Sequence, residues 1–569
     1  MKPIETEFPV VQISLLAERE SWRKEIFRPN YHIHKWWANR LGSVFRGLVL
    51  GAIAPEGEDI WASYYKTHCY SDKIVLDPFM GSGTTLGEVA KLGAKPIGCD
   101  INPVSTFAVT QSLTNTSTER LEEYFLELEK DIQPAISHYY STIEPSTGES
   151  IPVLYYFWVK QAVTPLGEVI PLFSSYVFSK NAYPSKKPLA KIVCPQCWEI
   201  NTDHYNATRV TCSHCHFAFN PQTGPVNGRY VTDSRGEKYE VRQLLPPSPG
   251  RFEHRLYAIM ALSSNGDKVY LPARQYDLDL MQEATAHLDR ENLPLPTMEV
   301  RPGHNTDQAR NYHYLHWRDF FNDRQLLCLG LLLKRILQIE DHVIRDQLVC
   351  LFSTCLEYNN MFCTFKGEGT GAVRPLFSNH ILKPERTPLE NNVWGTSQSS
   401  GSFSKLFRSK LLKAKEYLQR PFELTLDPTN KAGKSSNYVA SHPISVSVTD
   451  SWSEFSRSSN CALILNGDGA ELPIPDKVVD AIVTDPPYFD FVHYSELSDF
   501  FYAWLSPVLG MDYNYLNRVS SYHEREVQNK HVEIFAHNLA RVFSACRIRL
   551  RTEKRVSKLV QFFERCCYG

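Results

Sequence analysis

Two short peptides in this sequence combine residue types that could do chemistry. The first is TDPPYFDF, residues 484–491, in which Asp485 is followed by Pro486, Pro487 and the aromatic Tyr488. Proline contributes no N–H, so the pair leaves carbonyl acceptors on a stiff, extended backbone. A carboxylate beside such carbonyls accepts hydrogen bonds from an amine without offering competing donors. The peptide is therefore suited to hold an amino group and activate it as a nucleophile, while Tyr488 stacks on the attached ring.

The second peptide is LDPFMGSGTT, residues 76–85, in which Gly81 and Gly83 stand where an apolar run turns into a helical pattern. Glycines there allow close ligand approach, and a helix N-terminus offers amide donors to an anionic group. Asp100 ends the next apolar run, about 20 residues downstream, where an acid in this class of fold hydrogen-bonds ribose hydroxyls. Neither a Walker GK[ST] nor a complete GxGxxG follows, so we predict a nucleotide-like cofactor of another kind, with a purely structural turn as the alternative.

Four cysteines form two closely spaced pairs, CPQC and CSHC, at Cys194, Cys197, Cys212 and Cys215. Two such pairs can place four thiolates at about 2.3 Å around one tetrahedral Zn²⁺, leaving no open position for water. A structural zinc site is therefore the preferred interpretation. The alternative is two redox-active pairs.

The pattern around these peptides predicts an α/β fold. Residues 73–79 and 94–102 read as buried strands joined by a helix, and further strands with acids at their ends are expected near Leu463 and Ile482. Hairpin-like runs GRYVTDSRGEKYEV and YAIMALSSNGDKVYLPA favour a β-rich insertion, and WRDFFNDRQLLCLG begins at least two helices. We expect an N-terminal half-domain at 1–115, a helical linker at 116–150, the insertion at 151–300 with its cysteines at 194–215, and a C-terminal half-domain at 460–569. Between the insertion and the C-terminal half-domain we expect a helical and loop-rich substrate-recognition region at 301–459, with long substrate-facing loops from about Asn359.

Composition limits the class of protein. The 569 residues are 43% hydrophobic and 22% charged, which is typical of a globular protein with two to four folding units. The net charge of -2 excludes a polycation, so any nucleic-acid contact must use local basic clusters such as KLFRSKLLKAKEYLQR, which taken singly is more simply a solvated helix face. The N-terminus has no basic region before an apolar one, and no apolar run approaches about 20 residues, so we expect a cytoplasmic protein without a membrane partner.

DPFMGSGTT and DPPY together resemble motifs I and IV of S-adenosylmethionine-dependent amino-methyltransferases, which methylate adenine N6 or cytosine N4 in DNA. The resemblance implies a Rossmann-like methyltransferase sheet split by the long insertion. It implies that Asp485, Pro486, Pro487 and Tyr488 hold the target base. The segment NYHIHKWWANRLGSVFRGLV looks like the part that packs over the cofactor's methionine end, although Trp36 and Trp37 could equally be core residues. The residues implied to bind S-adenosyl-L-methionine are Asp77, Phe79, Gly81, Ser82, Gly83, Thr84, Asp100 and Asp468.

With the cysteine pairs included, the chain resembles the adenine-specific DNA methylases that contain a zinc ribbon, which are large prokaryotic proteins, some associated with restriction or phage-defence loci. This implies DNA as partner, Zn²⁺ as a structural metal and other subunits of such a system as further partners. The expected activity is methylation of adenine N6 in DNA. The alternatives are an RNA base-amine (guanine N2) methyltransferase and an inactive nucleic-acid-binding remnant.

The C-terminal end departs from the family pattern. After DPPY the family has further strands, whereas this chain continues with IRLRTEKRVSKLVQFFERCCYG, which is basic and helical in tendency. We therefore expect about four sheet strands and a sheet that is incomplete at the C-terminus. Truncation of the chain is the preferred explanation, and completion of the sheet by another chain is the alternative.

Overall fold

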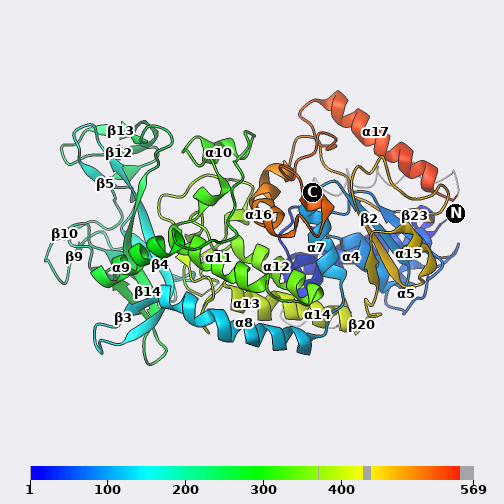
Figure 1. The fold of residues 1–569 in the computed structure, drawn as a ribbon, viewed down its shortest axis with the longest axis horizontal. Coiled ribbons are helices and arrows are strands. Elements are labelled where there is room, and N and C mark those ends of the chain that lie inside the picture. The colour runs from blue at the N-terminus through cyan, green and yellow to red at the C-terminus, as the bar shows by residue number, and fades with distance from the viewer. Residues whose placement is uncertain (1, 370, 427–437, 552–569) are drawn as a thin grey trace.

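The computed structural model of the chain describes residues 2–369, 371–426 and 438–551. The molecule is elongated (Figure 1), with a parallel sheet at one end of its long axis and a β-rich region at the other. Between them lie helices that include α11 (Asp323–Ile336), α12 (His342–Leu356) and α16 (Tyr494–Leu509). The chain therefore has the mixed α/β fold that the sequence predicts.

The parallel sheet has five strands among the described residues, in the order β21-β22-β2-β1-β23. They are β1 (Ile74–Asp77), β2 (Lys95–Asp100), β21 (Ser447–Thr449), β22 (Cys461–Asn466) and β23 (Ala481–Ile482). All neighbouring pairs run parallel. Four of these strands lie where the sequence predicts them. The fifth strand, β21, was not predicted, so the expected count of four is wrong. Its short Ser-Val-Thr run has one apolar residue and therefore shows no strand pattern in the sequence.

Helices bury both faces of this sheet, which explains why its strands are apolar runs. Val75 of β1 packs with α4 (Gly42–Ile53) and α6 (Thr84–Lys91) on one face. Leu76, its neighbour, points to the other face and packs with α15 (Trp452–Arg457) and α17 (Val532–Arg549). The helix α7 (Pro103–Leu113) lies over β22 on the first face. Other N-terminal helices are α1 (Pro3–Thr6), α2 (Val10–Ser21), α3 (Lys24–Phe27) and α5 (Ile60–Ser63).

The segment that follows α17 pairs with the edge of the sheet. Helix α17 ends at Arg549, and Leu550 forms a parallel bridge with Val479, just before β23. The Val479 amide donates to the Arg549 carbonyl, and the Arg551 amide donates to the Val479 carbonyl. The helical tendency predicted from Ile548 onward is therefore wrong at Leu550, where edge pairing satisfies the backbone instead. The rest of the predicted tail, 552–569, lies outside the described residues.

The β-rich region is built on a six-stranded sheet whose longest strands are β4 and β14. Its members are β3 (Ser141–Ile143), β4 (Ser150–Val163), β5 (Val169–Pro171), β14 (Glu253–Leu262), β15 (Lys268–Pro272) and β18 (Leu389–Asn391). The hairpin β14–β15 is confirmed, as is the hairpin of β12 (Tyr230–Thr232) and β13 (Lys238–Glu240). The short strands are β6 (Val177–Ser179), β7 (Leu189–Val193), β8 (Ile200–His204), β9 (Val210–Thr211), β10 (Ala218–Phe219) and β11 (Val226–Asn227). Strand β3 pairs with β4, so strand structure begins within the residues expected to form a helical linker.

The helical layer contains the largest apolar core of the described chain. The predicted helices α11 and α12 are confirmed, and each begins at a capping side chain, Asn322 and Asp341. The long helix α8 (Thr118–Tyr139) runs beneath this layer towards the β-rich end (Figure 1). The other elements are α9 (Gln275–Leu288), α10 (Asp307–Arg310), α13 (Phe403–Leu406), α14 (Leu412–Gln419), β16 (Thr364–Phe365), β17 (Val373–Arg374), β19 (Phe422–Leu424) and β20 (Tyr438–Ala440). None of the described helices is both long and apolar enough to cross a membrane.

The asparagine-rich peptides NNMFC and NNVWG lie inside the protein. Asn359 donates from Nδ2 to the Gly401 carbonyl at 2.9 Å, and Asn392 donates to the Val153 carbonyl at 2.8 Å. Both side chains are buried. These residues therefore clamp backbone segments together and do not form the substrate-facing loop surface expected for this part of the chain.

Candidate active site and metal centre

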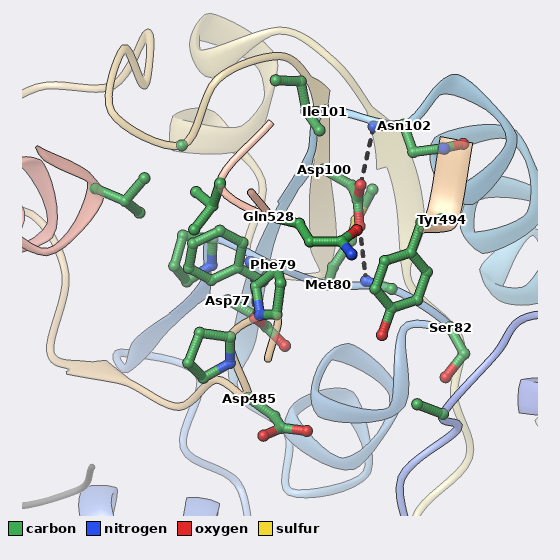
Figure 2. Close-up of a pocket in the computed structure, with 18 of the residues that line it drawn as sticks. Asp77, Phe79, Met80, Ser82, Asp100, Ile101, Asn102, Asp485, Tyr494 and Gln528 are labelled. Carbon is green, nitrogen blue, oxygen red and sulfur yellow. Dashed lines mark hydrogen bonds between the residues drawn. The ribbon is translucent and has the colours of Figure 1, made fainter. Parts of the chain in front are cut away.

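A cavity opens at the carboxyl edge of the parallel sheet, where β1, β2, β22 and β23 end. Both chemically distinctive peptides reach it (Figure 2). The predicted site residues that line it are Asp77, Phe79, Gly81, Ser82, Thr84, Asp100, Asp468, Asp485, Pro486 and Pro487. Parallel strands end at the same edge of a sheet, so peptides far apart in the sequence meet there.

The glycine turn after β1 has the backbone that the sequence predicts. Gly81 and Gly83 have φ values of +49° and +76°, which favour glycine, and α6 begins at Thr84. The indole of Trp36 packs against the turn. A Cβ added to Gly81 would lie 2.9 Å from Trp36 Nε1, so a larger residue at position 81 would collide with this ring. Trp36 and Trp37 both line the cavity, but Trp37 is also a buried core residue. Each of the two interpretations of this pair therefore describes part of its environment.

Asp77 connects the two peptides directly. Its buried carboxylate accepts hydrogen bonds from the Phe79 amide at 3.1 Å, Thr85 Oγ1 at 2.5 Å and Thr484 Oγ1 at 2.6 Å. Burial raises the pKa of Asp77 to about 6, against the effect of these three donors. Thr484 precedes Asp485, so the bond fixes the DPPY peptide against the strand that carries the glycine turn.

Asp100, at the end of β2, also lines the cavity. Its carboxylate accepts hydrogen bonds from the amides of Gly81 and Asn102, each at 2.9 Å (Figure 2). Burial raises the pKa of Asp100, and the two amides oppose the shift. Tyr494 of α16 also lines the cavity and stacks on Trp36, with ring centres 5.4 Å apart and planes at 13°. A flat ligand would thus be bounded by Asp100 and by stacked aromatic rings.

Asp485 and Tyr488 share a third partner, Arg40. The guanidinium forms an ion pair with the Asp485 carboxylate and donates from Nη2 to Tyr488 Oη at 2.8 Å. Tyr488 Oη in turn donates to Asp485 Oδ1 at 3.0 Å. Burial raises the pKa of Asp485, and Arg40 and Tyr488 counteract this. No local sequence pattern predicts this contact, although Arg40 lies in the segment that resembles the part packed over the cofactor's methionine end.

Asp468 lines the cavity but is already paired. Its carboxylate contacts Arg541 of α17 at 3.0 Å and Arg525 at 3.8 Å, and it accepts a hydrogen bond from the Ala470 amide. The predicted contact between Asp468 and S-adenosyl-L-methionine, through the amine of the cofactor's adenine, stays a prediction. Any such contact would use an oxygen that already bonds to a neighbouring residue.

The loop between α16 and α17 adds side chains that sequence reasoning missed. Glu526 and Gln528 line the cavity, and Gln528 points towards Phe79 and Asp100 in Figure 2. Glu526 accepts a hydrogen bond from Ser495 Oγ at 3.1 Å, and burial raises its pKa to about 8. No local pattern marks these residues, because their position follows from the path of the loop across the sheet edge.

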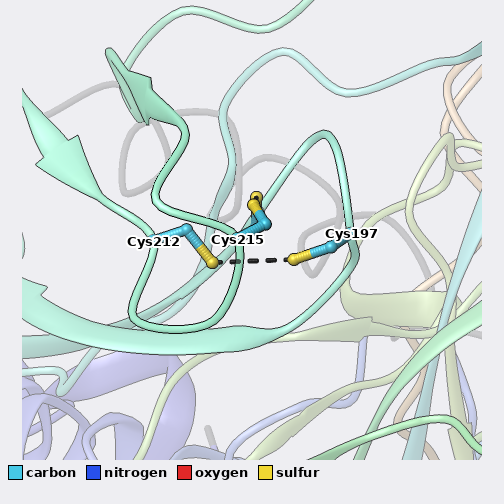
Figure 3. Close-up of side chains that lie close together, drawn as sticks. Cys197, Cys212 and Cys215 are labelled. Atoms are coloured by element: carbon cyan, nitrogen blue, oxygen red, sulfur yellow. Dashed lines mark hydrogen bonds between the residues drawn. The ribbon is translucent and has the colours of Figure 1, made fainter.

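The four cysteines meet in the β-rich region, and Figure 3 shows Cys197, Cys212 and Cys215 close together. Their Sγ atoms all lie within 4.8 Å of one another, and the pairs Cys194–Cys215 and Cys197–Cys212 are 3.6 Å apart. Each CxxC occupies the turn of a strand pair, β7–β8 or β9–β10. Tetrahedral Zn–S bonds of about 2.3 Å place sulfur atoms about 3.8 Å apart, so the cluster fits a zinc ion.

The two turns are closely alike. Trp198 donates its amide to the Cys194 carbonyl, and His216 donates to the Cys212 carbonyl. Both donors have positive φ, 67° and 59°. This repeated backbone geometry turns both thiols of each pair towards one point, which is how a closed metal site is built.

Comparison with known proteins finds similarity to DNA methylases over a short part of the chain. The profile of the DNA methylase family, named for N6 and N4 methyltransferases, matches residues 63–106, which contain β1, the glycine turn and β2. The segment that contains the glycine turn is therefore similar to DNA methylases. The type II methyltransferase M.MjaII of Methanocaldococcus jannaschii is 34% identical over 65 residues, which cover 11% of this chain and 12% of that protein. No solved structure matches the chain.

Proposed function

We propose that this protein is an S-adenosylmethionine-dependent DNA amino-methyltransferase that methylates adenine N6. The observation that carries the proposal is the single cavity in which the glycine turn and Asp485-Pro486-Pro487 face each other. Three further features support it. The profile match covers the turn, Thr484 bonds to Asp77, and aromatic rings border the space between the peptides. The sheet order is consistent with a Rossmann-like methyltransferase core entered by a long insertion.

We propose the following roles for the residues around the cavity. Gly81, Gly83 and the first turn of α6 would hold the cofactor, with Asp100 on its ribose. The cofactor supplies an electrophilic methyl group when bound. The Asp485 carboxylate and the Pro486 carbonyl would accept the two hydrogens of the target amine, which favours a pyramidal nitrogen with an available lone pair. In the transfer the amine nitrogen would form a bond to the methyl carbon while the bond between that carbon and the sulfonium sulfur breaks and leaves S-adenosylhomocysteine. The proton that the nitrogen loses would pass to Asp485 or water.

Incubation with labelled S-adenosylmethionine and either DNA or RNA, followed by digestion to nucleosides, tests the proposal. Label in N6-methyladenine from DNA is the expected result. Label in N4-methylcytosine from DNA would correct the target base, and label in N2-methylguanine from RNA would support the RNA alternative. Folded protein that fails to bind S-adenosylmethionine or its demethylated product in calorimetry would favour the inactive nucleic-acid-binding remnant.

We also propose that the cysteine cluster holds one structural Zn²⁺. Metal analysis of the purified protein should find about one zinc per chain. Cys212→Ser should lose it and lower the stability of the β-rich region, because the ion contributes directly to folding. Cys69→Ser, which changes an exposed cysteine outside the cluster, should keep the metal. A zinc content far below one per chain in the unaltered protein would contradict the proposal.

The remaining parts of the chain have proposed roles that follow from their position. Residues 151–300 would be an insertion held by the zinc site, and residues 301–459 would help to recognise DNA. Other subunits of a restriction or phage-defence system are proposed partners on the family resemblance alone. The DNA sequence that the protein prefers would depend on side chains of this DNA-recognition region that contact the edges of the bases.

A further inference from the structure

Arg40 occupies the place that the target amine needs in the proposed reaction. It pairs with the Asp485 carboxylate, donates to Tyr488 Oη at 2.8 Å and places its Cζ 5.2 Å from the centre of the Tyr488 ring. Tyr488 Oη closes the triangle by bonding to Asp485 Oδ1 at 3.0 Å. Both oxygens of the acceptor are therefore engaged, and the ring on which a base would stack carries a guanidinium.

A base can enter only when this triangle opens. Its amine must bond to the same carboxylate, and its ring must stack on the same tyrosine. A neutral amine competes poorly with a guanidinium for a carboxylate, because the guanidinium carries a full opposite charge and presents a rigid fork of N–H donors that matches the carboxylate. Adenine alone therefore lacks the interaction required to displace Arg40.

A polynucleotide supplies that interaction. A phosphate is an anion that a guanidinium binds with two parallel hydrogen bonds, so it can replace Asp485 as the partner of Arg40. The Arg40 side chain is 32% exposed, whereas Asp485 is 8% exposed. Arg40 thus stands at the mouth of the cavity, between the acceptor and solvent, where the backbone of an extruded nucleotide would pass.

We propose that Arg40 is a specificity-determining residue that makes the site respond to polynucleotide and exclude free adenine nucleosides. The inference rests on the proposed function. Free nucleosides carry the same exocyclic amine as DNA, so contacts to the base cannot separate the two substrates. Arg40 separates them because only the polynucleotide offers flanking phosphates that draw the guanidinium away from Asp485 and Tyr488.

The test compares Arg40→Ala with the unaltered protein on two substrates, duplex DNA and adenosine. Transfer to DNA, measured as kcat/KM, should fall by about tenfold or more, since a charge-assisted contact is lost. Transfer to adenosine should rise by about fivefold, since the competitor is gone. The slope of log kcat/KM for DNA against log salt should become shallower by about 0.9, the value of one phosphate contact.

Two further variants test whether the effects of Arg40→Ala come from the geometry and the location of this guanidinium. Arg40→Lys keeps the charge without the bidentate geometry and should give intermediate values on both substrates. Arg335→Ala removes an arginine whose ion pair with Asp131 is remote from the cavity, and it should leave both substrates unchanged. If Arg40 only holds Asp485 in place, Arg40→Ala will slow both substrates, and this overturns the inference.

The inference and the proposed function fail in different ways. If the unaltered protein methylates DNA and Arg40→Ala does not improve transfer to adenosine, the inference alone is wrong. Adenosine binding, measured by equilibrium dialysis with S-adenosylhomocysteine present, gives a readout without turnover and should tighten in Arg40→Ala. If the unaltered protein binds no cofactor and transfers no label, the proposed function fails and the inference with it.

Discussion

Asp485→Ala is expected to reduce methyl transfer to DNA by about 100- to 1,000-fold, the usual effect of removing one group that stabilises developing charge. The carboxylate is one of the two acceptors proposed for the target amine, and alanine offers none. Cofactor binding should change little, because Asp77, Asp100 and the glycine turn are untouched. Asp485→Asn keeps one acceptor oxygen in the same place and should retain more activity than the alanine variant.

Single-turnover transfer and calorimetry of cofactor binding measure the two effects separately. Asp490→Ala is a suitable control, because this acid lies in the same peptide but pairs with His493 at the surface. It should keep nearly full activity. Parallel loss of transfer and cofactor binding in Asp485→Ala would contradict the role assigned to Asp485.

Arg28→Ala is expected to lower the free energy of unfolding by about 3–5 kcal/mol, the range for breaking a buried ion pair from one side. Arg28 bonds to Glu423 at 2.6 Å and approaches Glu88 of α6 at 3.4 Å. Lys91 and Arg46 complete the cluster around Glu423, and all these side chains are at most 2% exposed. Removing Arg28 leaves buried carboxylates without one of their cations.

The same substitution should weaken cofactor binding, since Glu88 and Lys91 belong to the helix that follows the glycine turn. Urea unfolding gives the stability, and calorimetry gives the affinity. Arg335→Ala, which breaks a partly exposed pair, should cost no more than about 1 kcal/mol. A loss below about 1 kcal/mol in Arg28→Ala would show that neighbouring groups or water compensate.

The cluster also predicts a pH effect. Burial acts to raise the pKa of Glu423, but Arg28, Lys91 and Arg46 together hold it below its ordinary value. A lowered pKa stabilises the folded protein at neutral pH, and the contribution is lost as pH falls below the ordinary value of about 4.3.

The parts of the site carried by local pattern were predictable from the sequence. Gly81 and Gly83 lie in a turn at the carboxyl end of a strand, and acids lie at the ends of two apolar runs. Strands and turns depend on a few neighbouring residues, so the sequence predicts these positions. The four cysteines meet for the same reason, since spacing within each pair fixes the turn. Each of these predictions required only neighbouring residues.

The contacts that complete the site were not predictable, because they join segments that only the tertiary fold brings together. Arg40 is an ordinary arginine in the sequence, and nothing near it indicates a contact with the carboxylate of Asp485, which follows the end of β23. Glu526 depends on the path of a loop. The asparagines of NNMFC are typical of loop residues in composition. In the structure they are buried, and their side-chain amides donate hydrogen bonds to backbone carbonyls, so they hold the core together instead of facing a substrate.

The bond between Asp77 and Thr484 has a consequence for how such a protein can evolve. Strand β23 pairs with β1 in a fixed register, Val75 with Ala481 and Leu76 with Ile482. The spacing of the two peptides is thus set by neighbouring strands and not by the several hundred residues that join them in sequence. The intervening region can lengthen, shorten or be exchanged without moving Asp485 relative to the glycine turn. If the proposed function holds, target choice is therefore free to diversify while the geometry of the transfer is inherited unchanged.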